Sequence, residues 1–354
     1  MGQGRMPRLS SPVRGVLLGV TALMAALGFT RMWDDIERKA FDAMTVLSAP
    51  QRSVLPITII GIDEPSFAQV GQRWPWPRSL HARLVDRLAE AGAAVIAFDI
   101  VFAEASVPAE DAAFAAAIGR AGNVVLAADH AFHETAFFRQ WLRVDPLLAF
   151  TEAGALPGLA TIELDADGVA RQAPQGDDAL WRQAIRAFQR ARPGVIPGAA
   201  LPEGALIRHL GAAHTFPYIS YYQALNGDAS IPPDFFRDQI VLIGRDVRSS
   251  PEAGAAHADM FPTPFLAGSR VLTPGVEIHA TLIENAIAGM GVAPAPVLPR
   301  LRCSLRPCSL RRSPYSAGIP AGARPGCSRW ARRPRPAAMG CSSCGASGCR
   351  RSPP

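Results

Sequence analysis

The fold of this chain is decided by two short runs, Ile57-Thr58-Ile59-Ile60-Gly61-Ile62-Asp63 and Ala94-Val95-Ile96-Ala97-Phe98-Asp99-Ile100-Val101. Both runs are apolar and rich in β-branched residues, which is typical of strands that are buried on both faces in a parallel sheet. Each run carries an aspartate near its carboxyl end, Asp63 in the first and Asp99 in the second. We therefore expect two buried strands that end in acidic side chains.

A helix is predicted between these strands, because apolar residues recur there at helical spacing. Pro75 and Pro77 keep the helix from beginning much earlier, and Gly92 can end it. A right-handed strand–helix–strand unit brings Asp63 and Asp99 to the same edge of the sheet, on neighbouring or near strands. The apolar stripe of the helix consists of Leu80, Leu84, Val85, Leu88 and Ala91.

The alternation of helices and strands continues towards residue 292. Apolar patterns predict helices over 108–121, near 178–190 and over 277–288, strands over 124–128 and 239–244, and strand-like sequence over 207–225. The less regular residues 129–200 predict an insertion or a cap over the sheet. The predicted fold class is therefore α/β, with a mostly parallel sheet flanked by helices.

Several collinear motifs resemble those of the CHASE type-two sensor domain. They extend over about residues 40–292 and comprise Ile62-Asp63, Trp74-Pro75-Trp76-Pro77-Arg78, Phe98-Asp99-Ile100-Val101-Phe102, Asp165-Ala166-Asp167-Gly168-Val169-Ala170-Arg171, Phe216-Pro217-Tyr218-Ile219-Ser220-Tyr221, Gln239-Ile240-Val241-Leu242-Ile243-Gly244 and Thr273-Pro274-Gly275-Val276-Glu277-Ile278-His279-Ala280. The resemblance implies an extracytoplasmic sensory module of a bacterial receptor that binds a small molecule and works as a homodimer. It implies a cytoplasmic adenylate or guanylate cyclase or a kinase as effector, and it does not identify the ligand.

The amino-terminal residues predict a membrane anchor. Residues 1–14 are short and basic, residues 15–33 are apolar, and acidic residues follow at Asp34 and Asp35. Arginines before the span favour a cytoplasmic amino terminus, so that residues 34–292 lie on the periplasmic side of a single-pass inner-membrane protein. The alternatives are a cleaved signal peptide, whose apolar core has a similar length, and a buried helix of a soluble protein.

The composition changes abruptly in the tail, which we place at residues 293–354. Positions 300–354 hold twelve arginines and all six cysteines of the chain, but no acidic residue. The net charge of +6 therefore comes from the tail alone, and the preceding domain is mildly acidic, so we expect no nucleic-acid partner. Such a composition predicts disorder. It is explained either by out-of-frame translation, which would remove the effector, or by a genuine basic tail.

Residues 32–47 predict an amphipathic helix that joins the anchor to the domain. Its apolar side consists of Trp33, Ile36, Ala40, Met44 and Leu47. We interpret it as a conduit for the signal, and an ordinary packing helix is the alternative.

Asp63 and Asp99 are the principal candidates for a ligand site. Paired carboxylates at a sheet edge can bind a cation or transfer protons. The alternative is that each aspartate caps a helix or accepts hydrogen bonds from a loop. Trp74, Trp76 and Arg78 could form a lid with cation–π contacts, or a rigid packing corner.

The remaining motifs predict neither a metal nor a cofactor. Asp165 and Asp167 resemble a turn rather than a calcium loop, and His130 with His133 lacks a further metal ligand. No phosphate-binding glycine loop or nucleophile elbow is present. We therefore expect a sensory module rather than an enzyme. Two alternatives are a periplasmic enzyme that uses Asp63 and Asp99, and an anchored interaction domain.

Overall fold

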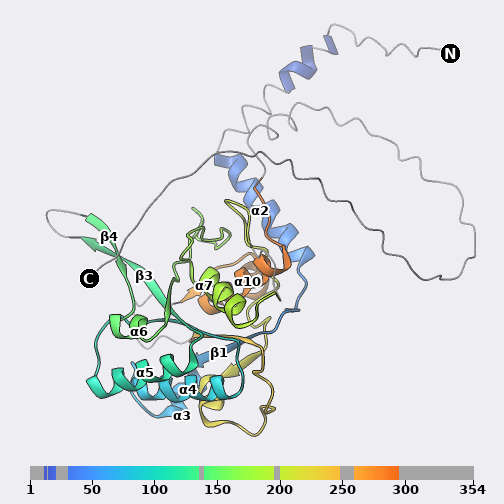
Figure 1. Cartoon of the computed structure of the whole chain (residues 1–354). Coiled ribbons are helices and arrows are strands. Elements are labelled where there is room, and N and C mark those ends of the chain that lie inside the picture. Colours follow the sequence, from blue (N-terminus) through green and yellow to red (C-terminus); the bar gives the residue numbers. More distant parts are fainter. Residues whose placement is uncertain are drawn as a thin grey trace, which may run out of the picture. The chain divides into compact units, whose positions relative to one another are not determined.

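The computed structural model (Figure 1) describes residues 12–13, 15–20, 31–134, 139–194, 200–247 and 259–294. Nearly all of the predicted tail and the middle of the predicted anchor lie outside these ranges. Within the described ranges, no helix is long and apolar enough to cross a membrane. The described residues belong to one compact unit, which extends over residues 1–307.

A mostly parallel sheet forms the centre of the structure, as predicted. Its seven strands lie in the order β4-β3-β2-β7-β1-β6, with β5 paired to β3. Only the β3–β4 pair is antiparallel. The strands are β1 (Ile57–Asp63), β2 (Val95–Val101), β3 (Val124–Glu134), β4 (Arg139–Val144), β5 (Leu156–Leu159), β6 (Tyr218–Ser220) and β7 (Ile240–Asp246).

Helices cover both faces of the sheet (Figure 1) because successive side chains of each strand point to opposite faces. On β2, Val95 and Ala97 join one hydrophobic core with α7 (Leu180–Ala191) and α10 (Gly275–Ala288). Ile96 and Phe98 join a second core on the opposite face. That core contains residues of α4 (Arg78–Glu90), α5 (Pro108–Ala121), α6 (Leu148–Glu152) and α8 (Tyr221–Asn226), and α3 (Glu64–Val70) packs there too.

The closing helix α10 is buried along almost its whole length, and its polar side chains bind loops. Glu277 accepts hydrogen bonds of 2.7 Å from the backbone N–H groups of His214 and Thr215. Asn285 bonds the backbone N–H and carbonyl of Arg208 at 2.7 and 3.0 Å. These bonds satisfy buried polar groups and attach α10 to the segment before β6.

Two predictions need correction. The strand-like sequence over 207–225 forms a strand only at Tyr218–Ser220, because the next residues begin α8 with a capping box at Ser220. Residues 129–200 are not simply a cap, since β5 extends the sheet and α7 packs Trp181 and Phe188 into the core. The predicted strand–helix–strand unit is present, and its strands are near rather than neighbouring, because β7 lies between them.

Candidate functional site

A cavity of about 390 Å³ opens at the carboxyl edge of the sheet, the edge at which α/β proteins bind ligands. We call it the edge cavity. Its charged lining comes from β2, β3 and β7 and from the residue before β8 (Met260–Phe261), and it consists of Asp99, Asp129, Arg245 and Asp259. Its apolar lining includes Trp74, Ile100, Ile162 and Phe261.

Two glycines allow α10 to begin directly against Asp99. Gly244 lies opposite Asp99 in the β2–β7 register, and a Cβ atom at Gly244 would stand 2.6 Å from Cβ of Val276. A Cβ atom at Gly275 would stand 3.4 Å from Oδ2 of Asp99 and 3.1 Å from the Phe261 ring. The absence of both side chains therefore lets Val276 and Phe261 pack closely around Asp99.

The Asp99 carboxylate is buried without a hydrogen-bond partner among the described residues. Its side chain is 9% exposed, and the closest basic group is Nε2 of His279, at 4.0 Å. That nitrogen lies 3.2 Å from the carbonyl oxygen of Ala160. Burial lowers the pKa of His279 to about 4, so the imidazole is neutral at neutral pH and does not compensate the charge of Asp99.

Burial and neighbouring carboxylates make the edge cavity unfavourable for negative charge. Burial, assisted by the charge of Asp129, raises the pKa of Asp99 to about 7. Burial and the charge of Asp99 raise the pKa of Asp259 to about 7, although Arg245 acts in the opposite direction. The two aspartates therefore change protonation near neutral pH, as groups at functional sites often do.

Arg245 and Trp74 also line the edge cavity and contact each other. The guanidinium carbon of Arg245 lies 5.8 Å from the Trp74 ring centroid, within the range of a cation–π interaction. Nε of Arg245 is buried and has no hydrogen-bond partner among the described residues. Asp129 is exposed and accepts a hydrogen bond of 3.0 Å from the Thr161 hydroxyl.

The other predicted lid residues line a second cavity of about 620 Å³, which shares Trp74 with the edge cavity. Trp76 is 3% exposed and packs 4.9 Å from the ring of Tyr221. Arg78 forms an ion pair of 2.7 Å with Asp111 and lies over the ring of Phe102. Contacts within the protein therefore fix Trp76 and Arg78, as in a rigid packing corner, whereas Trp74 lines both cavities.

Asp63 occupies a different position from Asp99. Its carboxylate caps α3, accepting a 2.9 Å hydrogen bond from the backbone N–H of Ser66, and it also accepts bonds from the hydroxyls of Ser220 and Tyr218. It pairs in register with Asp246 on β7, the strand that separates it from β2. The structure therefore does not bring Asp63 and Asp99 together, and Asp63 lines neither cavity.

A model of the CHASE2 domain matches residues 17–302, which is most of the chain. The chain belongs to the CHASE2 domain family. This match confirms the resemblance that the motifs indicated. CHASE2 domains are extracytoplasmic sensory domains of membrane receptors. No curated protein and no solved structure matches the chain.

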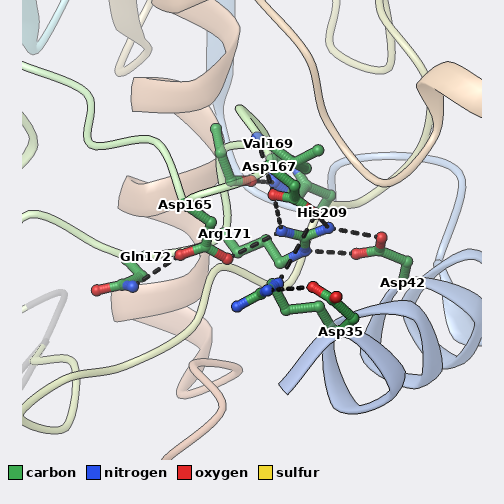
Figure 2. Close-up of polar contacts among 10 residues, drawn as sticks. Asp35, Asp42, Asp165, Asp167, Val169, Arg171, Gln172 and His209 are labelled. Carbon is green, nitrogen blue, oxygen red and sulfur yellow. Dashed lines mark hydrogen bonds and ion pairs between the residues drawn. The ribbon is translucent and has the colours of Figure 1, made fainter. Parts of the chain in front are cut away.

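One functional candidate of this CHASE2 domain was missed by sequence reasoning. Arg171 is 2% exposed and bonds three carboxylates, those of Asp42, Asp165 and Asp167 (Figure 2). Asp42 belongs to α2 (Arg31–Ser48), whereas Asp165 and Asp167 belong to a turn of the domain body. The sequence predicted a turn at Asp165 and Asp167, and Arg171 ends the same motif. No sequence pattern indicated that the Arg171 side chain would contact α2.

Among the described residues, no group of three or more His, Cys, Asp or Glu is arranged to hold a metal ion. His130, discounted as a metal ligand, lies on β3 rather than on a helix. Of the five predicted ligand-binding residues, Asp99 and Trp74 line the edge cavity, Trp74, Trp76 and Arg78 line the second cavity, and Asp63 lines neither.

Proposed function

We propose that this CHASE2 domain is the extracytoplasmic ligand-binding module of a membrane signal-transduction receptor. Residues 15–33 would anchor it in the inner membrane, and a cytoplasmic cyclase or kinase would give the output. The observation that supports ligand binding most strongly is Asp99, whose side chain is 9% exposed and opens into the edge cavity without a hydrogen-bond partner among the described residues.

A buried carboxylate of this kind destabilises the unliganded protein. Buried polar groups are normally hydrogen-bonded, and an unpaired buried charge is costlier still. A ligand that donates to Asp99 removes this cost, so the binding free energy includes a term that an exposed carboxylate would not supply. The volume of about 390 Å³ also lies within the range of small-molecule sites.

The route from the edge cavity to the membrane would pass through the domain body to α2. Arg171 attaches α2 to the turn at Asp165 and Asp167. A ligand changes the position of α2 only if it binds one arrangement of the domain more tightly than another. The ion pairs of Arg171 give α2 a defined arrangement that such a preference could stabilise or release.

A second copy of the chain would complete the receptor, with α2 as the contact. Trp33, Ile36, Ala40, Ala43 and Leu47 recur at alternating spacings of three and four, the pattern of a coiled-coil seam. These residues are exposed, whereas Phe41, Asp42 and Thr45 on the opposite side are at least partly buried. The acidic residues Asp34, Asp35 and Glu37 beside the seam disfavour an anionic membrane surface as its occupant.

Two measurements on the full chain test this function. Protease added to spheroplasts should digest the domain, and protease added to inverted membrane vesicles should leave it intact; the reverse result contradicts the proposed topology. Thermal unfolding in nanodiscs, with fractions of a small-molecule extract, should reveal a fraction that stabilises the wild type but not Asp99→Asn. Asp234→Asn serves as the matched control, because the Asp234 side chain is exposed and lines neither cavity. If no fraction acts through Asp99, ligand binding at the edge cavity is wrong.

A further inference from the structure

The charges that line the edge cavity do not balance. Among the described residues that line it, Asp99, Asp129 and Asp259 are accompanied by a single cation, Arg245. His279, packed beneath Asp99 on α10, is neutral because burial lowers its pKa to about 4. Once its carboxylates are ionised, the lining has an excess of negative charge that a bound cation would neutralise.

A metal ion does not fit this excess. The described part of the chain contains no group of three or more His, Cys, Asp or Glu that is arranged to hold a metal. A hard cation also requires several oxygen ligands at short distance. The edge cavity instead offers Ile100, Ile162 and Phe261 beside its carboxylates, so its occupant should carry apolar carbon as well as positive charge.

The position of Asp99 fixes the polar end of the occupant. Its carboxylate lies next to Gly275, the first residue of α10, and both residues line the edge cavity. Among the described residues it has no hydrogen-bond donor, and an ionised carboxylate accepts bonds from several. An ammonium group carries three N–H donors and a full positive charge, and it therefore satisfies such a carboxylate better than a hydroxyl or an amide.

Trp74 offers an apolar surface to the carbon part of the occupant. Its ring lines the edge cavity and lies 5.8 Å from the guanidinium carbon of Arg245. An aromatic face attracts cations and also packs against aliphatic carbon. Phe261 adds a second apolar surface beside Gly275.

We propose that the ligand of the edge cavity is a small organic amine in its ammonium form. This inference rests on the proposed function, in which the edge cavity binds a ligand. Its ammonium group pairs with Asp99 and Asp259, and its carbon part packs against Trp74 and Phe261. Arg245 limits the excess negative charge, which explains how the cavity keeps three carboxylates together while it is empty of a ligand.

The test uses the full chain in nanodiscs and isothermal titration calorimetry at about pH 8, where a simple amine keeps its proton. The probes are ethanolamine, putrescine and phenethylamine, each beside a neutral and an acidic analogue of the same carbon skeleton. At least one amine should bind, and its neutral and acidic analogues should not. Asp99→Asn and Asp259→Asn should each weaken amine binding about tenfold or more, because each removes a charge-assisted bond.

Asp234→Asn should leave amine binding unchanged, since Asp234 is exposed and pairs with Arg237 on its own surface segment. Circular dichroism of each variant verifies that it is folded. The proposal is overturned if none of the three amines binds, if an acidic analogue binds instead, or if a divalent metal alone binds through Asp99. If an extract fraction free of amines stabilises the protein through Asp99, the assignment of the ligand as an amine is wrong, while the proposed sensory function stands.

Discussion

Arg171 and Asp42 are joined by two hydrogen bonds across 129 residues of sequence, from Nε to Oδ1 and from Nη2 to Oδ2, each of 2.7 Å. Figure 2 shows the guanidinium of Arg171 between Asp42 of α2 and the carboxylate of Asp165. Burial acts to lower the pKa of Arg171, but its hydrogen bonds to three aspartates raise the pKa above its ordinary value. The guanidinium therefore stays charged, and this bidentate bond links α2 to the domain body together with weaker contacts from Arg38 to Asp167 and from Arg208 to the Ser48 carbonyl oxygen.

Asp42→Asn should loosen α2 without unfolding the body. The change removes the negative partner of a charge-assisted bidentate bond, which costs about 1.5–3 kcal/mol. Hydrogen exchange measured by mass spectrometry should become faster in α2, while the β-sheet keeps its protection. Asp35→Asn is the matched control, because Asp35 is exposed and pairs with Arg38 of the same helix. Equal protection of α2 in Asp42→Asn and wild type would show that Arg171 does not hold the helix.

The contribution of Asp99 to stability should fall as the pH rises from about 4 to about 7. Burial, followed by the charge of Asp129, raises its pKa to about 7, from an ordinary value of 3.8. In this interval the folded protein keeps a proton that the unfolded chain releases, so raising the pH favours unfolding. This contribution should stop changing above the raised pKa. The other titrating groups are common to both proteins, so the melting temperature of Asp99→Asn relative to that of wild type should rise over the interval, whereas Asp234→Asn should follow wild type.

Gly275 and Gly244 should respond differently to a methyl group. Ala at 275 places Cβ 3.4 Å from Oδ2 of Asp99 and 3.1 Å from Phe261, a ring at the cavity wall, so it should obstruct ligand binding with little loss of stability. Ala at 244 places Cβ 2.6 Å from Cβ of Val276, so α10 must shift, and overpacking of this kind costs about 1–3 kcal/mol. Thermal unfolding with and without the amine probe separates the two effects. A strongly destabilised Gly275→Ala variant would contradict this distinction.

Asp63→Ala should destabilise the protein and leave the edge cavity unchanged. Asp63 caps α3 through Ser66, and removal of such a cap costs about 0.5–2 kcal/mol. Loss of the bonds from Ser220 and Tyr218 adds to this cost. Denaturant unfolding measures the change, and calorimetry with the amine probe should give the wild-type affinity. A large loss of affinity would contradict this prediction and indicate that Asp63 takes part in ligand binding.

Local patterns were sufficient to predict much of the fold. The apolar runs at β1 and β2 and the helical stripe of α4 are each determined by residues close in sequence, and all three elements formed where expected. The predicted helix over 108–121 also coincides with α5. The position of β7 between β1 and β2 was not predictable, because strand order depends on contacts between distant residues and not on the pattern within each strand.

The candidate site was predictable only in part, for the same reason. Asp99 could be singled out because it lies near the end of an apolar run, and Trp74 because it belongs to a motif of tryptophans and an arginine; both line the edge cavity. Asp129, Arg245 and Asp259 have ordinary local sequence, and only the folded sheet brings them to that cavity. The separation of Asp63 from Asp99 follows from β7, whose place in the sheet no local pattern determined.

Cysteine at Ala40 should form disulfide cross-links between two copies of the chain in bacterial membranes. Ala40 lies on the exposed side of α2, at the centre of the seam defined by Trp33, Ile36, Ala43 and Leu47. In a parallel coiled coil such core positions approach their equivalents in the partner helix. The six tail cysteines, all beyond residue 302, are first replaced by serine so that only the new thiol can react.

Cysteine at Thr45 is the matched control for this cross-link. Thr45 lies on the same helix but is 5% exposed, on the side that faces the domain body with Asp42. Mild oxidation should give a dimer of Ala40→Cys on a denaturing gel without reductant, and little or none of Thr45→Cys. Cross-linking at both positions to the same extent would indicate collisions without a defined seam. If both variants stay monomeric, the exposed side of α2 is not the contact between two copies, because the thiols introduced at Ala40 would then not approach each other.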